Sequence, residues 1–217
     1  MNSKLPLLPV ELYGMPMKVN IQDVLFWMDA IRDSDDRYRT LESFWKGQLN
    51  SKIWLAENLV GFVPVRPLNI VIYGGWNGVL ASILFNSNIN INRIKSVDID
   101  PVCEEIANTV NTLYLDQGKF SAITADMTTF VDKTADVVVN TSCEHITQEQ
   151  YDQWLSNQPD HATIVLQSNN YIDLDEHIRC CTDLKEFMHI SNINTYLCKT
   201  LPTLKYDRYM LIGKKKV

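Results

Sequence analysis

The sequence has 217 residues, 46% of them hydrophobic, which is enough to bury a core in one domain with an elaboration. The formal net charge of −6 argues against a general nucleic-acid groove, and no apolar run approaches the roughly 20 residues of a membrane span. The five cysteines are an odd number without a regular framework, so reduced thiols in a cytoplasmic protein are expected.

Residues 1–66 are predicted to form an irregular arm followed by a helical cap. Prolines and a glycine make residues 1–19 irregular, and Asn20 is a plausible N-cap for the first helix. The apolar residues of this helix fall on one face, and they are Ile21, Val24, Leu25, Met28 and Ile31. After a polar break at residues 33–36, helical spacing resumes up to Gly61 and predicts one second helix. Its aromatic residues Phe44, Trp45 and Trp54 are expected to dock onto the main domain, with a substrate lid as the alternative.

The segment 69–85 is the centre of the predicted main domain, which covers residues 67–217. A short apolar run from Ile70 to Tyr73 breaks into Gly74, Gly75 and Gly78, and apolar residues then return at helical spacing. This pattern predicts a buried strand, a glycine turn and a helix. Such a turn brings the backbone close to a ligand, although a tight turn without a ligand has the same pattern.

Strands and helices alternate after residue 68 with short connections, which predicts a doubly wound, Rossmann-like α/β sheet. Further strands are expected at 93–100, 120–127, 136–140 and 163–167, and a terminal hairpin at 195–199 and 209–212. Helices are expected after Pro101, after a capping box of Thr147 and Gln150, and around Phe187.

Polar residues follow the predicted strands where ligands bind in an open parallel sheet. Asp98 ends the second strand at the spacing from Gly78 at which an acid reaches a ribose hydroxyl. Asp126 ends the third strand, where it can accept a hydrogen bond from an adenine amino group. The fourth strand ends in the polar run 140–145. The alternative is that Asp98 and Asp126 only cap the following helices.

In this order and spacing, the glycine loop, Asp98, Ala125-Asp126 and the run Glu144-His145-Ile146 resemble the class I S-adenosylmethionine-dependent methyltransferases. The resemblance covers about residues 68–213. It implies a sheet of about seven strands whose last strand is antiparallel. A looser similarity, based on Phe44-Trp-Lys-Gly-Gln48 and Lys52-Ile-Trp54, is to small methyltransferase-like proteins of tailed bacteriophages, which implies the host cytoplasm.

The resemblance implies S-adenosylmethionine as cofactor and an unidentified methyl acceptor, with a small molecule or protein favoured over bulk nucleic acid. The implied cofactor-binding residues are Tyr73, Gly74, Gly75, Trp76, Gly78, Asp98, Ile99, Asp126, Met127 and Asn140. The implied catalytic residues are Asn140, which orients the acceptor, and Glu144 or His145, which takes its proton. For His145 the alternative is a helix-entry histidine bonded to the backbone.

Two departures from the family pattern leave alternatives open. Ile72 stands where the family has an acid, and Trp76 stands where it has the middle glycine of the loop. The alternatives are a binding module without turnover and an NAD-binding oxidoreductase, although Tyr73 occupies the first glycine position of a dinucleotide loop.

A metal site is not assigned from the sequence, because no tight ligand spacing is present. A less favoured reading has Glu144, His145, Glu176, His177 and Cys180 converging on a metal. Cys180 and Cys181 are expected to be small buried hydrophobic residues.

Overall fold

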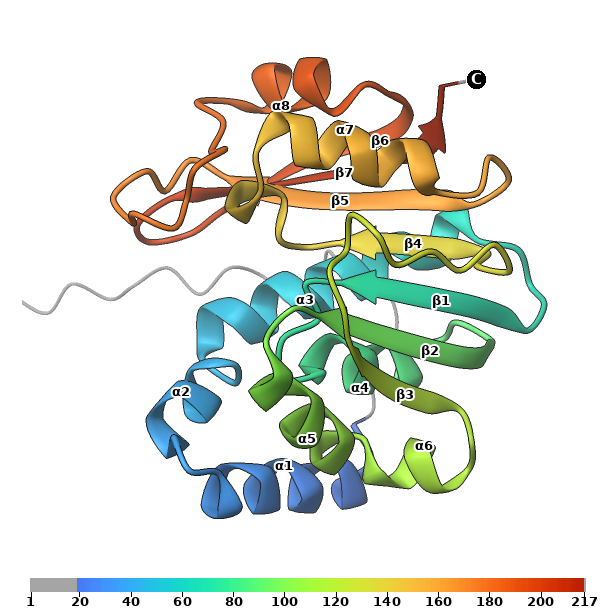
Figure 1. Ribbon diagram of the computed structural model, residues 1–217, viewed down its shortest axis with the longest axis vertical. Helices are drawn as coiled ribbons and strands as arrows, with labels where there is room; N and C mark the ends of the chain where they lie inside the picture. Colours follow the sequence, from blue (N-terminus) through green and yellow to red (C-terminus); the bar gives the residue numbers. More distant parts are fainter. Residues whose placement is uncertain (1–18, 217) are drawn as a thin grey trace, which may run out of the picture.

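The computed structural model describes residues 19–216, and it shows a seven-stranded sheet with helices on both faces (Figure 1). The strands are β1 (Leu68–Tyr73), β2 (Ile91–Asp98), β3 (Phe120–Thr124), β4 (Val137–Asn140), β5 (Thr163–Asn169), β6 (Ile193–Pro202) and β7 (Asp207–Lys215). Their order across the sheet is β3-β2-β1-β4-β5-β7-β6. The first five strands pair in parallel, whereas β7 is antiparallel to both β5 and β6. The predicted Rossmann-like fold with an antiparallel last strand is confirmed.

The helices are α1 (Ile21–Asp33), α2 (Arg37–Glu42), α3 (Lys46–Leu59), α4 (Val79–Phe85), α5 (Pro101–Val110), α6 (Thr112–Asp116), α7 (Gln148–Asn157) and α8 (Leu184–Ser191). Short 3-10 turns lie at Val60–Phe62 and Cys143–His145. The predicted caps are confirmed: Asn20 accepts from the first turn of α1, and Thr147 and Gln150 form the capping box of α7. The arm expected over residues 1–19 lies outside the described residues, apart from Val19. Among residues 19–216, no helix is long and apolar enough to cross a lipid bilayer.

Two helices, α2 and α3, replace the single helix predicted between the polar break and Gly61. The Ser43 hydroxyl donates to the Thr40 carbonyl at 2.7 Å, and Trp45 has an extended backbone with ψ 147°. A hydroxyl that bonds its own helix backbone competes with continuation of the helix. The prediction of one helix was therefore wrong at residues 43–45.

The expected aromatic docking surface holds for two residues and fails for the third. Trp54 is buried in the core, and Phe44 packs against the core cluster that contains β1, with its ring 5.4 Å from that of Trp27. Trp45 lies at the helix break and is 68% exposed. Of the five apolar residues that predict α1, Ile21, Leu25 and Met28 face outward and are more than half exposed, whereas Val24 and Ile31 are half-buried.

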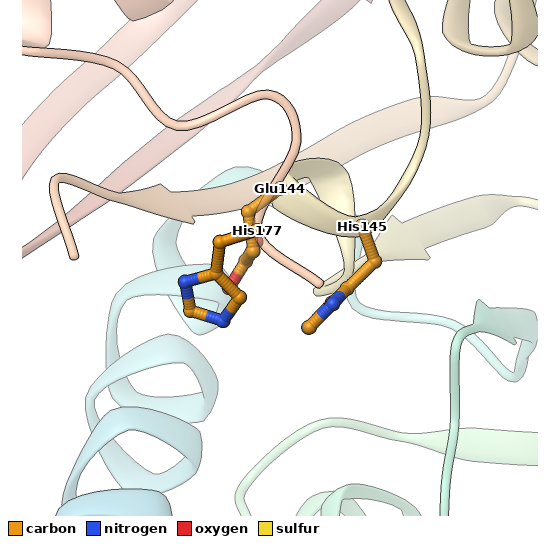
Figure 2. A group of neighbouring side chains, drawn as sticks. All are labelled: Glu144, His145 and His177. Atoms are coloured by element: carbon orange, nitrogen blue, oxygen red, sulfur yellow. The ribbon is translucent and has the colours of Figure 1, made fainter. Parts of the chain in front are cut away.

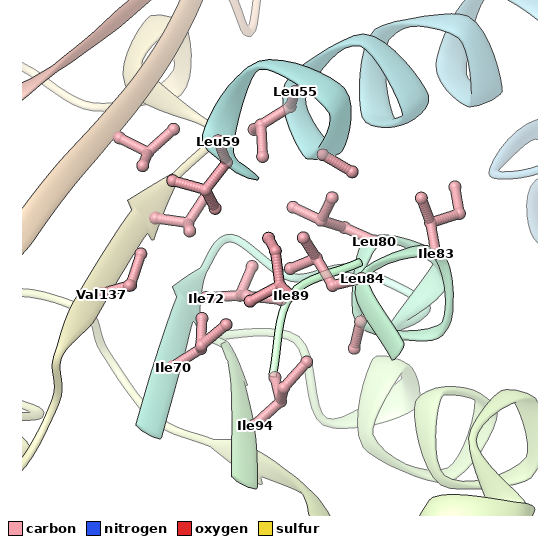
Figure 3. Close-up of a cluster of buried hydrophobic side chains, with 14 of the residues drawn as sticks. Leu55, Leu59, Ile70, Ile72, Leu80, Ile83, Leu84, Ile89, Ile94 and Val137 are labelled. Carbon is pink, nitrogen blue, oxygen red and sulfur yellow. The ribbon is translucent and has the colours of Figure 1, made fainter. Parts of the chain in front are cut away.

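The hydrophobic core lies on both faces of the sheet. On one face, β1 residues Ile70 and Ile72 contact α3 and α4, as Figure 3 shows for Leu55, Leu59 and Leu80. On the other face, strand residues pack with Tyr151 and Trp154 of α7 and Phe187 of α8, which cover β5 and β7 in Figure 1. Because both faces are covered, the carboxyl edge of the sheet is the place left open for a ligand.

Candidate functional site

A cleft of about 980 Å³ lies along the carboxyl ends of the parallel strands. Its floor comes from the glycine loop after β1 and from the ends of β2 and β3, and its walls come from α2, α3 and the loops after β4 and β5. The predicted site residues that line it are Gly74, Gly75, Trp76, Asp98, Ile99, Asp126, Met127, Glu144 and His145. Residues that the sequence places at four strand ends therefore meet in one cleft.

Close packing requires the first two glycines of the loop. A Cβ at Gly74 would lie 2.0 Å from the Ser142 hydroxyl, and a Cβ at Gly75 would lie 2.0 Å from the Ser96 hydroxyl. Gly74 also has φ +63°, in the left-handed region that favours glycine. The glycines thus bring the loop against β2 and the loop after β4, which exposes the intervening backbone to the cleft.

Asp98 holds the backbone of the glycine loop. Its Oδ2 accepts from the Trp76 amide at 2.8 Å, and its Oδ1 accepts from the Asp100 amide at 3.1 Å. An ionised carboxylate has about four acceptor positions, so Asp98 keeps acceptor capacity toward the cleft that it lines. The N-cap of α5 is Asp100, whose side chain accepts from Val102. The alternative that Asp98 caps this helix is wrong.

Asp126 organises a turn after β3 and presents its carboxylate at the surface. Its Oδ1 accepts from the Thr128 amide at 2.7 Å and from the Thr128 hydroxyl at 2.8 Å. The residue is exposed and lines the cleft, and both of these hydrogen bonds go to Oδ1 and leave Oδ2 to other partners. The neighbouring Met127 also lines the cleft. Asp126 therefore caps a turn rather than an α-helix, and it offers a carboxylate oxygen to a ligand.

Three predicted site residues are buried beneath the cleft rather than lining it. Tyr73 is fully buried, and its side chain packs in the core on the α7 side of the sheet. Gly78 has φ +70°, and a Cβ there would lie 2.7 Å from the amide nitrogen of Asn111. Asn140 is fully buried and accepts from the Ser142 amide at 2.9 Å. These residues shape the loops that line the cleft, and direct contact with a ligand stays a prediction.

Glu144 is a buried acidic residue in the wall of the cleft. It is 2% exposed, and its Oε1 accepts from Asn169 at 2.6 Å and from Arg208 at 2.9 Å. Arg208 also donates to the Thr141 carbonyl at 3.2 Å. Within the described part of the chain, the other oxygen of Glu144, Oε2, has no hydrogen-bond partner although it is buried. Such an oxygen is expensive to bury unless a ligand satisfies it.

Sequence patterns do not identify Arg208, whereas Asn169 belongs to the polar cluster 168–171 that follows the predicted fifth strand. In the structure Asn169 is the last residue of β5, at the edge where ligands bind. Arg208 lies at the start of β7, which reaches the same edge because β7 is antiparallel to β5. The sequence signal for Arg208 is therefore its place at the beginning of the last strand.

Two histidines stand beside Glu144, as Figure 2 shows. The rings of His145 and His177 are 4.8 Å apart between centroids, and one potential ligand atom from each lies within 4.8 Å of a Glu144 oxygen. His145 is bonded to the backbone through Nδ1 at 3.2 Å from the Glu176 carbonyl, as its alternative reading expects. Of the five residues considered for a metal, Glu144, His145 and His177 come together.

α3 brings an unexpected basic group into the cleft. Lys52 lines the cleft, and its Nζ donates to Gln48 at 2.8 Å. Burial, reinforced by the positive charge of Arg208, lowers the pKa of Lys52 to about 7. An amine with this pKa is partly neutral near pH 7 and can accept a proton.

The mouth of the cleft is rimmed by exposed apolar side chains. These residues are Tyr38, Leu41, Trp45, Ile99 and Leu174, and all of them line the cleft. Large apolar side chains gathered around a polar floor are typical of ligand-binding sites. The cleft is therefore suited to a ligand with both polar and apolar parts.

The fold is similar to solved structures that include methyltransferases. Magnesium protoporphyrin IX methyltransferase from Synechocystis PCC 6803 with bound SAH has a TM-score of 0.64 at 13% identity, covering 91% of this chain and 96% of that chain. MtNAS in complex with S-adenosylmethionine has a TM-score of 0.57 at 18% identity, covering 89% and 72%. Geranyl diphosphate C-methyltransferase from Streptomyces coelicolor has a TM-score of 0.58 at 8% identity, covering 85% of each chain.

At these identities the similarity shows the fold alone. No protein-family model and no curated protein matches the sequence. The finer resemblance to bacteriophage proteins finds no support in the structures named above.

Proposed function

We propose that this chain is an S-adenosylmethionine-dependent methyltransferase whose cofactor lies along residues 74–76, Asp98 and Asp126. The observation that carries the proposal is the meeting of two carboxylates with the exposed backbone of the glycine loop in one cleft. The fold is shared with methyltransferases whose structures contain S-adenosylmethionine or SAH, which supports the same assignment.

The residues present fit the chemistry of this cofactor. The free acceptor positions of Asp98 match a pair of ribose hydroxyls, and the surface carboxylate of Asp126 matches an adenine amino group. Ile99 and Met127 lie beside these acids in the cleft and offer apolar contact to the base. When bound, the cofactor supplies a methyl group on a sulfonium.

The opposite wall of the cleft then holds the methyl acceptor. Methyl transfer needs an in-line approach and removal of a proton from the acceptor where one is present. Lys52 and His145 face this side and can take the proton, whereas Glu144 is engaged by Arg208 and orients the acceptor. Asn140 acts as a positioning residue through the loop that it holds at Ser142.

The size and rim of the cleft favour a small-molecule acceptor. The volume of about 980 Å³ is near the upper end of ordinary ligand pockets, so it accommodates the cofactor and a second small molecule. The apolar rim matches an acceptor with an aromatic or aliphatic part. A protein side chain entering from the rim is the second candidate acceptor.

Calorimetric titration with S-adenosylmethionine and with S-adenosylhomocysteine tests the proposal. We expect both to bind with comparable affinity, and transfer of labelled methyl groups to a fraction of a cell extract would support turnover. Binding without transfer to any fraction would favour a binding module. Heat with NAD and none with either sulfur compound would favour the oxidoreductase and overturn the proposal.

Three predictions from the sequence stay predictions. They are the division at residues 66 and 67 into a helical cap and a Rossmann-like domain, the cytoplasmic location and the phage relationship. α3 contributes Leu55 and Leu59 to the same core cluster as β1, so separation of the two parts by proteolysis would test the division.

A further inference from the structure

We propose that Glu144, His145 and His177 bind a divalent transition-metal ion in the cleft. The three side chains come from two loops at the carboxyl edge and point toward the same space (Figure 2). Their candidate ligand atoms already lie within 4.8 Å of one another. Ligands that share one ion at about 2.0–2.2 Å lie about 3–4 Å apart, so a modest rotation of the imidazoles completes the site.

The hydrogen bonds of both histidines prepare the other ring nitrogen for a metal. His145 Nδ1 lies 3.2 Å from the Glu176 carbonyl, and His177 Nδ1 lies 2.6 Å from the Tyr171 carbonyl. A carbonyl oxygen only accepts, so in each ring Nδ1 carries the proton and Nε2 keeps its lone pair. Metal-binding histidines are typically held in this way by a backbone carbonyl or a carboxylate.

The unpartnered oxygen of Glu144 is the second, independent observation. Asn169 and Arg208 both bond Oε1, which fixes the carboxylate, and among the described residues Oε2 has no partner. The side chain is nearly inaccessible to solvent at 2% exposure. A cation beside the histidines satisfies this oxygen directly.

The surrounding charges are compatible with a bound cation. Arg208 pairs with Glu144 and would by itself oppose a second positive charge. The loop that carries His177 also carries three exposed carboxylates, Asp173, Asp175 and Glu176. These acids offset the guanidinium and attract divalent cations to the mouth of the cleft.

The donor set indicates the class of metal. Two imidazoles and one carboxylate suit Zn²⁺, Mn²⁺, Fe²⁺ or Co²⁺ better than Mg²⁺ or Ca²⁺, which prefer oxygen ligands. The nearby Cys180 sulfur lies 3.3 Å from the Asn169 side-chain oxygen and 3.2 Å from the Tyr171 carbonyl, so its single proton has an acceptor in either direction and the thiol serves as a neutral donor. Three protein ligands leave coordination positions open for an exogenous oxygen ligand.

Glu144, His145 and His177 line the side of the cleft assigned to the methyl acceptor, and this further step rests on the proposed function. An acceptor oxygen bound there would be oriented, and its proton would become more acidic. In the metal-bound chain His145 Nε2 would be occupied by the ion, which leaves Lys52 as the base for this proton. The metal site therefore points to an acceptor with a hydroxyl or carboxylate oxygen.

Titration of the purified full chain with Co²⁺ tests the site without any cofactor or acceptor. We expect one Co²⁺ per chain, with visible absorption bands of nitrogen and oxygen ligation and no thiolate charge-transfer band, and displacement by Zn²⁺. His145→Ala and His177→Ala should each weaken Co²⁺ binding at least ~10-fold. His161→Ala and His189→Ala remove the two other histidines, both exposed, and should leave binding unchanged.

Co²⁺ binding by Glu144→Gln gives a further check of the site. Circular dichroism measures the fold of this variant, because the substitution changes a buried ion pair. His145 is exposed, so its alanine variant is expected to fold and keeps the test decisive. Failure of the wild-type chain to bind Co²⁺, a thiolate band, or unchanged binding in the His145 and His177 variants would overturn the metal site. Because S-adenosylhomocysteine binding is measured separately, failure of the proposed function would be recognised independently.

Discussion

At the scale of single residues, Trp76 shows how the glycine loop tolerates its departure from the family pattern. The residue stands where the resembled family has a glycine, and its φ of +47° lies in the left-handed region. A bulky side chain seldom adopts this conformation, which costs roughly 1–3 kcal/mol. The hydrogen bond from its amide to Asp98 at 2.8 Å holds the backbone there.

A pair of substitutions at Trp76 measures this backbone cost. Trp76→Ala and Trp76→Gly both remove the indole, but only glycine adopts a positive φ without strain. We expect Trp76→Gly to be more stable than Trp76→Ala by ~0.5–1 kcal/mol in urea unfolding. An alanine variant of equal or greater stability would show that the loop relaxes out of this conformation.

Asp98→Ala separates ligand binding from loop support. The bound cofactor would lose the partner of its ribose hydroxyls, and charge-assisted hydrogen bonds of this kind contribute roughly 1.5–3 kcal/mol each. S-adenosylhomocysteine affinity measured by calorimetry should fall at least ~10-fold. The loss of the Trp76 contact should also lower the free energy of unfolding by about 1 kcal/mol.

The exposed Asp116 provides the matched control for Asp98, because Asp116→Ala makes the same change of charge on α6. It should leave both affinity and stability unchanged. If Asp98→Ala lowers stability but the folded fraction keeps its affinity, Asp98 supports the loop and does not bind the cofactor.

At the scale of secondary-structure elements, the break between α2 and α3 determines what the cap contributes to the cleft. The break places Trp45 at the rim, and α3 directs Lys52 into the interior of the cleft. On the other side, the loop between β5 and α8 supplies His177 and the carbonyls that orient both histidines. One wall of the cleft is thus shaped by the break between α2 and α3, and the other by the loop between β5 and α8.

Lys52 makes the stability of the fold depend on pH. Its pKa is about 7 in the folded chain, below the ordinary value of 10.5, so between these values the unfolded chain binds more protons. Stability therefore rises with pH across this window, and the penalty of burial is fully present below pH 7. Lys52→Met should stabilise the fold most at acidic pH.

We expect Lys52→Met to raise the free energy of unfolding by about 2 kcal/mol near pH ~6, and by less than half of that near pH ~9.5. This figure is about half of the free energy that corresponds to the full pKa shift of Lys52, because the side chain is partly exposed. Urea unfolding at both pH values provides the measurement. Lys46→Met, at an exposed position on the same helix, should show no such difference, and an equal response of the two variants would contradict the assignment.

At the scale of the whole molecule, the strand order gathers residues that are distant in sequence. Glu144 follows β4, Asn169 ends β5 and Arg208 begins β7, and the three meet because these strands are neighbours in the sheet. The ion pair between Glu144 and Arg208 is almost fully buried, with side chains 3% and 9% exposed. Removal of one partner leaves a buried charge without compensation.

Arg208→Met tests the importance of this ion pair to the fold. We expect a loss of about 3 kcal/mol of stability, because Glu144 is left unpaired in a buried position. The double variant Arg208→Met with Glu144→Gln should recover part of this loss. A single variant as stable as the wild type would mean that solvent reaches Glu144.

The sequence predicted the fold well because hydrophobic periodicity and glycine placement are local signals. The alternation after residue 68, the caps at Asn20 and Thr147, and the acids at the ends of β2 and β3 all came from such signals. The meeting of His145 and His177 came from the sequence only as the less favoured metal reading, because it depends on strand order and on the loop after β5. Arg208 depends on the pairing of β7 with β5, which local patterns do not encode. The orientation of α1 was also not predicted. Asp23 faces the interior, where its Oδ2 accepts from Tyr114 at 2.8 Å, and exposed apolar residues of the helix face solvent.

The antiparallel entry of β7 also has a consequence for the order in which the chain folds. The parallel strands β1, β2 and β3, whose paired residues are much closer in sequence, bring together the glycine loop, Asp98 and Asp126 without any contribution from β7. Glu144 obtains Arg208 only when β7 pairs with β5, a contact between residues 64 positions apart. A contact of long sequence separation carries a larger loop-closure cost than a contact between nearby segments. The half of the cleft proposed for the cofactor should therefore be assembled before the half proposed for the acceptor.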